Sequence, residues 1–380
     1  MSAEQPASRE PSPVVRIVRD AVALHALRTD WAALEDRAAH YGLYVTWGYV
    51  SLAWQHLASP GDELFVLTVH DPVTQALTGV LPLVRVTERH HGLTVRVLRH
   101  IGIWEGERPG VLALESPDEV WAAAWRHLVA HRGEWQVLDL RELDDGAWPL
   151  RALQAPGAGF AARAGADIEA PWQRLDGPWA LHLGLRSEVL RAQRVRAMAQ
   201  LEAARPGLCV AVAEQPGEIA DALARYLALE RALVEAGGGV TLGSDPRRAA
   251  LYRDWLPRLA ARGDAAVWLL GGADGEVAGL IRLRCGDVWI ERHACYDPAL
   301  AEHTPSLLLA VEALQRSFGT TAQECDLVNL REPAGAAASV LDWFDDRRPT
   351  RRLAVRNLRS VLGPVELLRQ LAARLRGAAG

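Results

Sequence analysis

Three side chains near residue 293 have the types and spacing needed for proton transfer. Glu291 and His293 stand two residues apart in the run DVWIERHACY (287–296), and Tyr296 ends that run. The run is rich in β-branched and aromatic residues, so it predicts a strand in which alternate side chains share a face. Imidazole titrates near neutrality, which makes His293 the candidate general base, with Glu291 to orient or replace it. The competing interpretation is an ordinary Glu and His pair on the solvent face of an edge strand.

Cysteine chemistry is a less favoured alternative at the same place. Cys295 falls on the predicted face of His293, but a strand buries the thiol and nothing near it in the sequence lowers its pKa. Cys209, Cys285 and Cys325 also lie in predicted strands without metal-ligand spacing. We therefore expect buried small side chains, no metal site and no disulfide framework.

The elements around this strand predict a β-β-α-β unit. The preceding run VAGLIRLR (277–284) forms a hairpin with it, and Tyr296-Asp297-Pro298 breaks the strand. Thr304-Pro305-Ser306 then opens a helix, with Thr304 at the N-cap and Pro305 in the first turn. The run ECDLVNL (324–330) follows as a buried strand. The helix N-terminus offers unpaired N–H groups and partial positive charge, which suit an anion such as a pyrophosphate.

The block HACYDPALAEHTPSLLL (293–309) resembles the corresponding block of the CelD-like proteins, a branch of the GNAT acyltransferase superfamily related to the FemAB proteins. Members show a Tyr-Asp turn, a Ser-Pro-Gly helix start and an Asp-containing strand. This chain has Tyr296-Asp297, Thr304-Pro305-Ser306 and Asp326 at these places. It departs from the pattern twice, with His293 in place of a lysine and Ser306 in place of the glycine.

This resemblance implies an N-acyltransferase that uses acyl-CoA as co-substrate and holds no permanent cofactor. Thr304 and Ser306 are then expected to bind the pyrophosphate of CoA, and Tyr296 to protonate the leaving thiolate. His293 takes the proton of the attacking amine, although any step that depends on the family's lysine is in doubt here.

The resemblance also implies three substrate-binding residues. Glu230 belongs to the Leu-Glu pair of YLALERALVEAGGGVTL (226–242), where the family's following Trp-Lys is missing, so an ordinary helix charge stays open. Asp326 lies in the last strand. Arg194 lies in an Arg-rich helix after Ser187, for which a solvated helix between two lobes is an equal alternative.

The order of predicted elements repeats along the chain. A strand, two helices, three strands, a helix and a strand fill 14–143, and the same succession fills 209–330. We therefore predict an α/β protein with two tandem GNAT-like folds. The expected parts are listed in chain order: a disordered tail (1–13), an N-terminal lobe (14–180), an Arg-rich linker helix (181–204), a C-terminal lobe with the active cleft (205–357) and a basic amphipathic helix (358–380).

Composition limits the partners. The 380 residues are 49% hydrophobic with a net charge of −5, so we expect no nucleic-acid partner. No apolar run approaches the roughly 20 residues of a membrane span, and the first residues lack a signal peptide's features, which predicts a cytoplasmic location. The stripe of leucines and arginines in 358–380 either packs on the protein or contacts the inner membrane peripherally.

The expected acceptor is an envelope-related amine. The C-terminal helix favours a lipid amine such as a sphingoid base, and an amino sugar of exopolysaccharide synthesis is the alternative. Two other functions stay open from the sequence: a catalytically inactive scaffold, because the family's lysine and glycine are missing, and a FemAB-type aminoacyl transferase that uses charged tRNA, because of the Arg-rich helix.

Overall fold

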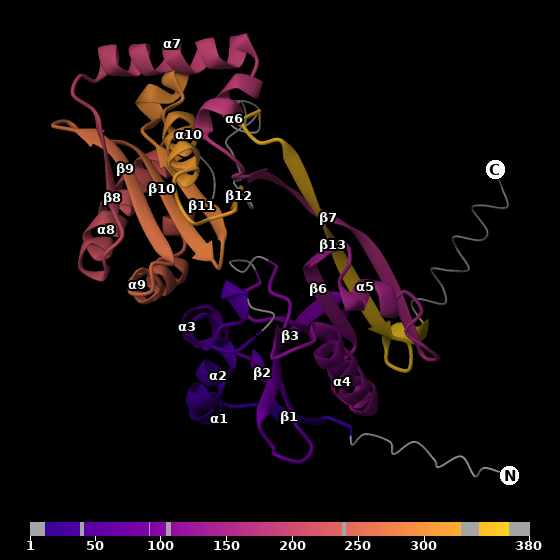
Figure 1. Cartoon of the computed structure of the whole chain (residues 1–380). Coiled ribbons are helices and arrows are strands. Elements are labelled where there is room, and N and C mark those ends of the chain that lie inside the picture. The colour runs from indigo at the N-terminus through magenta and orange to yellow at the C-terminus, as the bar shows by residue number, and fades with distance from the viewer. Residues whose placement is uncertain are drawn as a thin grey trace, which may run out of the picture. The chain divides into compact units, whose positions relative to one another are not determined.

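The computed structural model describes residues 12–38, 42–90, 92–103, 108–237, 241–327 and 342–364. The chain divides into two compact units, which Figure 1 shows with their labelled elements. Unit 1 comprises Met1–Asp167 and Thr350–Gly380, and unit 2 comprises Ile168–Pro349. Two strands, β7 (Phe160–Arg174) and β13 (Asp346–Asn357), contribute residues to both units.

Unit 1 is a mixed α/β unit built on a mostly antiparallel sheet. Its strands follow the spatial order β1, β2, β3, β4, β6 and β13, and β4 and β6 form a parallel pair. A buried cluster that includes Phe65, Leu81, Trp121 and Trp135 packs α4 against this sheet. The elements of unit 1 besides β7 and β13 are β1 (Val14–Val18), α1 (Ala21–Ala26), α2 (Arg28–Glu35), η1 (Leu43–Val45), α3 (Trp47–Leu57), β2 (Glu63–His70), β3 (Leu77–His90), β4 (Leu93–His100), β5 (Leu112–Ala113), α4 (Pro117–Ala130), η2 (Arg132–Glu134), β6 (Val137–Asp144) and α5 (Trp148–Ala152).

Unit 2 has the same kind of sheet, in the order β8, β9, β10, β11, β12 and β7, with β11 and β12 as its parallel pair. Its N-terminal helices include the expected Arg-rich one, where the Ser187 side chain accepts a hydrogen bond from Leu190 N–H as the predicted N-cap. The elements of unit 2 are α6 (Trp179–Leu185), α7 (Glu188–Ala204), β8 (Cys209–Ala213), α8 (Pro216–Glu235), η3 (Leu242–Ser244), α9 (Pro246–Ala260), β9 (Ala265–Gly272), β10 (Gly275–Cys285), β11 (Val288–Tyr296), η4 (Pro298–His303), α10 (Pro305–Ser317) and β12 (Glu324–Asp326).

The two units repeat one topology, which confirms the predicted internal repeat. In each, a strand leads through helices to three antiparallel strands, and a further helix leads to a strand parallel to the third. A local detail repeats as well. Glu35 accepts a hydrogen bond from Trp47 N–H at 2.6 Å, and Glu230 accepts one from Leu242 N–H at 3.0 Å, each carboxylate binding an amide 12 residues later.

Helices cover both faces of the sheet in unit 2 (Figure 1). On one face, a Cβ added at Gly279 of β10 would lie 2.7 Å from the Tyr226 ring, so α8 packs closely there. Its neighbour Leu280 packs in the cluster that contains Leu308 and Leu309 of α10. Since neighbouring strand residues point to opposite faces, α8 and α10 lie on opposite sides of β10. These are called the α8–α9 face and the α10 face below.

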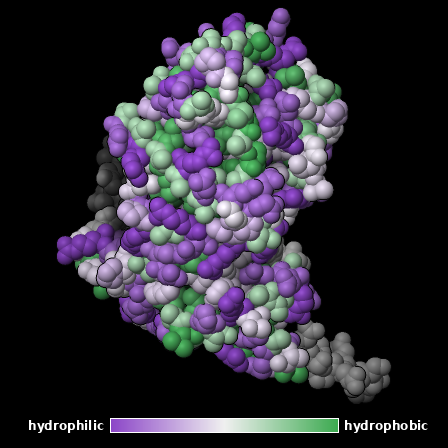
Figure 2. All heavy atoms as spheres, turned by 90° about the vertical axis from the view of Figure 1, so that its left-hand side faces the viewer, coloured by the Kyte–Doolittle hydropathy of each residue, from purple (hydrophilic) through white to green (hydrophobic). Residues whose placement is uncertain are grey.

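The surface shows where apolar side chains remain exposed. Figure 2 shows hydrophilic and hydrophobic residues interspersed on one face of the molecule. Among the large apolar side chains that are exposed, a group lies on α6 and α7: Leu181, Leu185, Val189, Val195 and Met198. None of the helices in the described parts of the chain has the length and apolar character needed to cross a membrane. The predicted C-terminal helix (358–380) lies outside the described residues from 365 onward, and within its described part Leu362 is buried.

Candidate active site

A β-bulge in β11 decides which way the predicted catalytic side chains point. Glu291 lies opposite Arg282 of β10, whereas His293 lies opposite Ile281, so Arg292 is an extra residue in β11. Residues opposite each other in a β-ladder share a face, and neighbours along β10 alternate. Glu291 and His293 therefore point to opposite faces of the sheet. The prediction that they share one face is wrong, because the extra residue interrupts the two-residue period.

Glu291 belongs to a buried ion pair on the α10 face. Its carboxylate is fully buried, and Oε1 lies 2.8 Å from Nε of Arg282. The Arg282 guanidinium lies over the Trp289 ring, 4.7 Å from its centroid. Burial raises the pKa of Glu291, while the Arg282 charge and a hydrogen bond from the Cys325 thiol oppose that rise. In this position Glu291 neutralises Arg282. The expectation from the sequence, that Glu291 orients His293, is wrong.

His293 lies on the α8–α9 face, against α9. Its Nε2 is 2.9 Å from the hydroxyl of Tyr252, and the two rings meet edge to face with centroids 5.1 Å apart. Burial lowers the pKa of His293 well below its usual range, and the positive charges of Arg292 and Arg248 lower it further. The imidazole is therefore neutral at pH 7, the form that a general base requires.

Tyr252 is a site residue that the sequence analysis did not single out. It is fully buried and lies on the inward stripe of α9 with Ala249 and Leu256. From helical periodicity alone, a residue at such a position is expected to pack in the core. The one available signal was the choice of tyrosine for a buried stripe, since a buried hydroxyl needs a hydrogen-bond partner.

Cys295 shares the α8–α9 face with His293, as predicted, because it lies opposite Gly279. Its thiol is buried and donates to the carbonyl of Tyr226 at 3.8 Å. Burial raises the pKa of Cys295 well above its usual range, and the nearby Glu230 charge raises it further. The thiol is therefore protonated at neutral pH, which argues against a cysteine nucleophile.

The start of α10 lies beside the end of β11. The Ser306 hydroxyl donates to the carbonyl of Cys295 at 3.1 Å, which ties the helix to the strand. The first intrahelical bond runs from Leu308 N–H to the Thr304 carbonyl, so the N–H groups of Ser306 and Leu307 have no acceptor within the helix. The positive end of the helix dipole thus lies at the end of β11.

Thr304 occupies the predicted N-cap position but does not act as a side-chain cap. Its side chain makes no capping hydrogen bond, and its backbone is left-handed, with φ 48° and ψ 50°. Because this conformation crowds Cβ, it costs roughly 1–2 kcal/mol in a residue other than glycine. Thr304 therefore supplies a tight turn between η4 and α10, and both Thr304 and Ser306 are partly exposed.

Tyr296, the last residue of β11, lies on the α10 face. It is opposite Ala278 and packs against the cluster that contains Leu300 and Leu308. Its face is therefore the one opposite His293. Asp297 follows and caps η4 by accepting from Ala299 N–H at 3.0 Å.

Glu230 is engaged by the backbone at the start of η3. Its carboxylate is buried and accepts hydrogen bonds from Leu242 N–H and Gly243 N–H, at 3.0 and 2.5 Å. Burial raises the pKa of Glu230, and these backbone hydrogen bonds oppose the rise. The matching bond of Glu35 in unit 1 indicates that this carboxylate organises the entry to the next helix in both units.

Asp326 and Arg194 also have partners within unit 2. Asp326 is fully buried in β12, 3.1 Å from Nη1 of Arg348. Arg194 of α7 donates to Gln315 of α10 at 2.9 Å and lies 3.6 Å from Glu312. Burial lowers the pKa of Arg194. These contacts join strands and helices of the unit, and neither residue is brought next to His293 by them.

Comparison with known proteins relates part of this chain to a family model. Residues 190–336 match the family model described as an acetyltransferase (GNAT) domain. Among curated proteins, none matches the sequence. The crystal structure of FemX is similar to this chain at 10% identity and a TM-score of 0.57, covering 86% of this chain and 95% of that one.

Two further crystal structures share the fold. A conserved protein of unknown function from Bacteroides thetaiotaomicron has 10% identity and a TM-score of 0.53, covering 90% of this chain and 100% of that one. The C-terminal domain (DUF2156) of a putative lysylphosphatidylglycerol synthetase from Agrobacterium fabrum has 12% identity and a TM-score of 0.52, covering 89% and 93%. The match to 190–336 falls in unit 2, and unit 1 repeats its topology. Residues 190–336 thus match the model of an acetyltransferase (GNAT) domain, and the chain is built from two copies of this fold.

Proposed function

We propose that unit 2 transfers an acyl group from acyl-CoA to an amine, with His293 as general base. The observation that carries the proposal is the neutral imidazole held by the Tyr252 hydroxyl on β11, the strand that leads into α10. A neutral histidine accepts a proton from an attacking amine, and the adjacent helix N-terminus suits an anionic donor.

The donor is expected at α10. The N–H groups of Ser306 and Leu307 precede the helical hydrogen-bond ladder and lie at the positive end of the helix. The pyrophosphate of CoA carries the complementary charge. Thr304 shapes the turn that exposes this end, so the two residues expected from the sequence have different roles: Thr304 sets the backbone and Ser306 contributes an amide.

The reaction follows from the two faces of β11. On the α8–α9 face, His293 takes a proton from the amine, directly or through Tyr252, as the nitrogen attacks the thioester carbon. The tetrahedral intermediate then breaks its C–S bond, and Tyr296 on the α10 face donates a proton to the departing thiolate. The products are an amide and CoA. His293 and Tyr296 lie on opposite faces of β11, so the thioester carbon has to lie at the end of the strand for both groups to act on it.

We propose an envelope-related amine as acceptor and membership of the CelD-like branch. A lipid amine such as a sphingoid base is the first candidate and an amino sugar the second. The preference for the lipid rests on the stripe in 358–380, of which 358–364 are described. In a turnover assay, an inactive scaffold would release no CoA thiol from acyl-CoA, and a tRNA-dependent transferase would require charged tRNA.

The test distinguishes the effect of an added negative charge at Ser306 from the effect of losing its hydroxyl group. Ser306→Asp puts a carboxylate against the pyrophosphate and is expected to weaken CoA binding by about tenfold or more, measured by calorimetry. Ser306→Ala is the matched control, because it removes the bond to the Cys295 carbonyl without adding charge. We expect the alanine variant to stay within about threefold of wild type. Equal CoA affinity in a folded Ser306→Asp protein would move the donor site away from this helix.

A further inference from the structure

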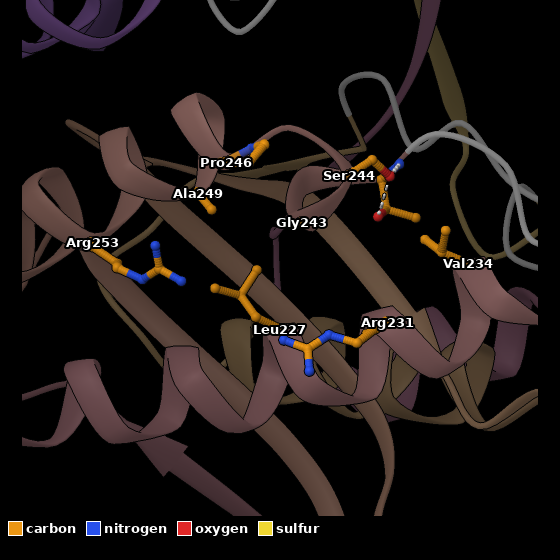
Figure 3. Close-up of a pocket in the computed structure, with 9 residues that line it drawn as sticks. Leu227, Arg231, Val234, Gly243, Ser244, Pro246, Ala249 and Arg253 are labelled. Atoms are coloured by element: carbon orange, nitrogen blue, oxygen red, sulfur yellow. Dashed lines mark hydrogen bonds between the residues drawn. The ribbon is translucent and has the colours of Figure 1, made fainter.

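A second site lies between α8 and α9, where a pocket of about 260 Å³ opens (Figure 3). Leu227 and Arg231 of α8 and Ala249 and Arg253 of α9 line its sides. Each pair is spaced four residues apart, so both members of a pair lie on the same face of their helix. The connection through η3 closes one end of the pocket.

Two arginines dominate this pocket. Figure 3 shows the guanidinium groups of Arg231 and Arg253 reaching from opposite helices toward the Leu227 side chain between them. Within the part of the chain that the structure describes, neither group has a hydrogen bond, ion pair or aromatic partner. Arg225, two turns earlier on α8, shows the contrast, because it forms an ion pair with Glu276. The pocket therefore gathers two uncompensated positive charges over an apolar floor.

Nearby carboxylates do not neutralise these arginines. Glu230 precedes Arg231 but gives its carboxylate to the N–H groups of Leu242 and Gly243. Asp245, at the start of α9, accepts from the Arg247 N–H at 2.8 Å. The described residues that line the pocket include no acidic side chain. The two positive charges thus remain available to a ligand.

The end wall of the pocket is held in place before any ligand binds. Thr241 N–H donates to the Ser244 hydroxyl at 2.9 Å, and the two hydroxyls lie 3.1 Å apart. Nη1 of Arg248 donates to the Thr241 carbonyl at 3.0 Å. Glu230 holds the same turn by accepting a hydrogen bond from Gly243 N–H. A preformed wall reduces the entropy that binding would otherwise have to offset.

From this geometry we propose that the α8–α9 pocket is a binding site for a phosphate monoester. Guanidinium groups bind phosphate through paired N–H donors, and two of them match the charge of roughly −1.5 to −2 that a phosphate monoester carries near pH 7. The single charge of a carboxylate would match only one of the two guanidinium groups. The volume lies just below the usual range for small-molecule sites, so it fits a phosphate with a short apolar stem over Leu227 and Ala249. The site is separate from the proposed donor site at α10 and does not depend on the transfer reaction.

The test compares two double variants of the full chain. Arg231→Gln/Arg253→Gln removes both pocket charges, and Arg191→Gln/Arg258→Gln removes two exposed charges of α7 and α9 that are not among the pocket residues. Calorimetric titration uses glycerol phosphate as the monoester. We expect saturable binding to wild type, a loss of about 100-fold or more in the pocket variant, and a change within about threefold in the control.

Folding and the α10 site provide independent readouts. Without phosphate, the pocket variant should melt at or above the wild-type temperature, because the substitution removes neighbouring like charges. It should also bind 3′-dephospho-CoA, which keeps the pyrophosphate but has no phosphate monoester, as wild type does, while Ser306→Asp should bind glycerol phosphate normally. These crossed results keep the two sites distinguishable. Absence of saturable binding to any phosphate probe, or an equal loss in both double variants, would overturn the proposal.

The source of the phosphate is resolved by a second arm. Phosphatidylcholine vesicles with and without phosphatidic acid are sedimented with wild type and with both double variants. Binding that needs phosphatidic acid and is lost in the pocket variant identifies a lipid headgroup as the source. Tight binding of glycerol phosphate with no preference for phosphatidic acid identifies a soluble phosphate ester. Vesicle binding that both double variants lose equally reflects net charge and counts against the pocket.

Discussion

The hydroxyl of Tyr252 and Nε2 of His293 lie 2.9 Å apart, although 41 residues separate them in the sequence. This contact joins α9 to β11 on the α8–α9 face. Because His293 is neutral, Nε2 either accepts the phenol proton or donates its own, according to the tautomer. In both arrangements the hydroxyl fixes the orientation of the imidazole. If His293 is the base as proposed, Tyr252 positions it, and in one arrangement the hydroxyl can pass a proton to it.

His293→Ala should lower turnover by about 10² to 10⁴ while leaving acyl-CoA affinity nearly unchanged, because it removes the base and leaves the α10 start intact. Turnover is measured by release of free CoA thiol and affinity by calorimetry. Tyr252→Phe should lower kcat by a smaller factor than His293→Ala, since it keeps the ring and the base. Tyr49→Phe in unit 1 is the matched control, because it removes a tyrosine hydroxyl bonded to the Gly102 carbonyl. Wild-type turnover in His293→Ala would place the catalytic group elsewhere.

The pH dependence of kcat/KM gives a second prediction. The base acts only when unprotonated, so activity falls as the pH drops through the pKa of His293, which burial and two arginines hold well below its usual range. Wild-type activity should therefore stay level as the pH falls past 6.5. Arg248→Gln removes one of the charges that lower this pKa, so its acid limb should move to higher pH. An unmoved limb in Arg248→Gln would mean that a different group titrates.

Glu291 should matter for stability more than for chemistry. Glu291→Ala leaves Arg282 buried without its partner and is expected to cost roughly 3–5 kcal/mol of unfolding free energy, measured in urea. The double variant Arg282→Met/Glu291→Leu replaces the pair by apolar side chains of similar size and should recover most of this loss. It should also keep turnover. A stable double variant without activity would restore Glu291 as a catalytic candidate.

Glu230 and Glu35 allow the same test in both units. Glu230→Ala leaves the buried N–H of Leu242 and the part-buried N–H of Gly243 without their acceptor, and Glu35→Ala leaves the part-buried N–H of Trp47. The cost is roughly 1–3 kcal/mol for the buried group and less for the part-buried ones. Both variants should lower the melting temperature, and KM for the amine should not change in the protein that remains folded. If Glu230 contacts substrate instead, KM should rise about tenfold with little change in melting temperature.

The sequence by itself determined the order of elements and the internal repeat. Apolar periodicity and turn residues are local signals, so they located β11, the start of α10 and most of the strands on each side. They also indicated His293 as a candidate base, because a histidine in a predicted strand that precedes a predicted helix start can be recognised from the sequence. The first helix of the predicted succession is a pair in the structure, α1 and α2, which a turn at Leu27 separates.

Only the tertiary structure decided the faces and the partners. Arg292 is an extra residue only in the pairing of β11 with β10. That pairing puts Glu291 and His293 on opposite faces of the sheet. Strand β13, rich in arginine, is stabilised by pairing across long sequence distances, as in the bidentate contact of Arg352 with Asp139, 213 residues away. No local pattern predicts such a strand, because its partners are set by the fold. The sequence supplies the groups that can react, and long-range packing decides which of them meet.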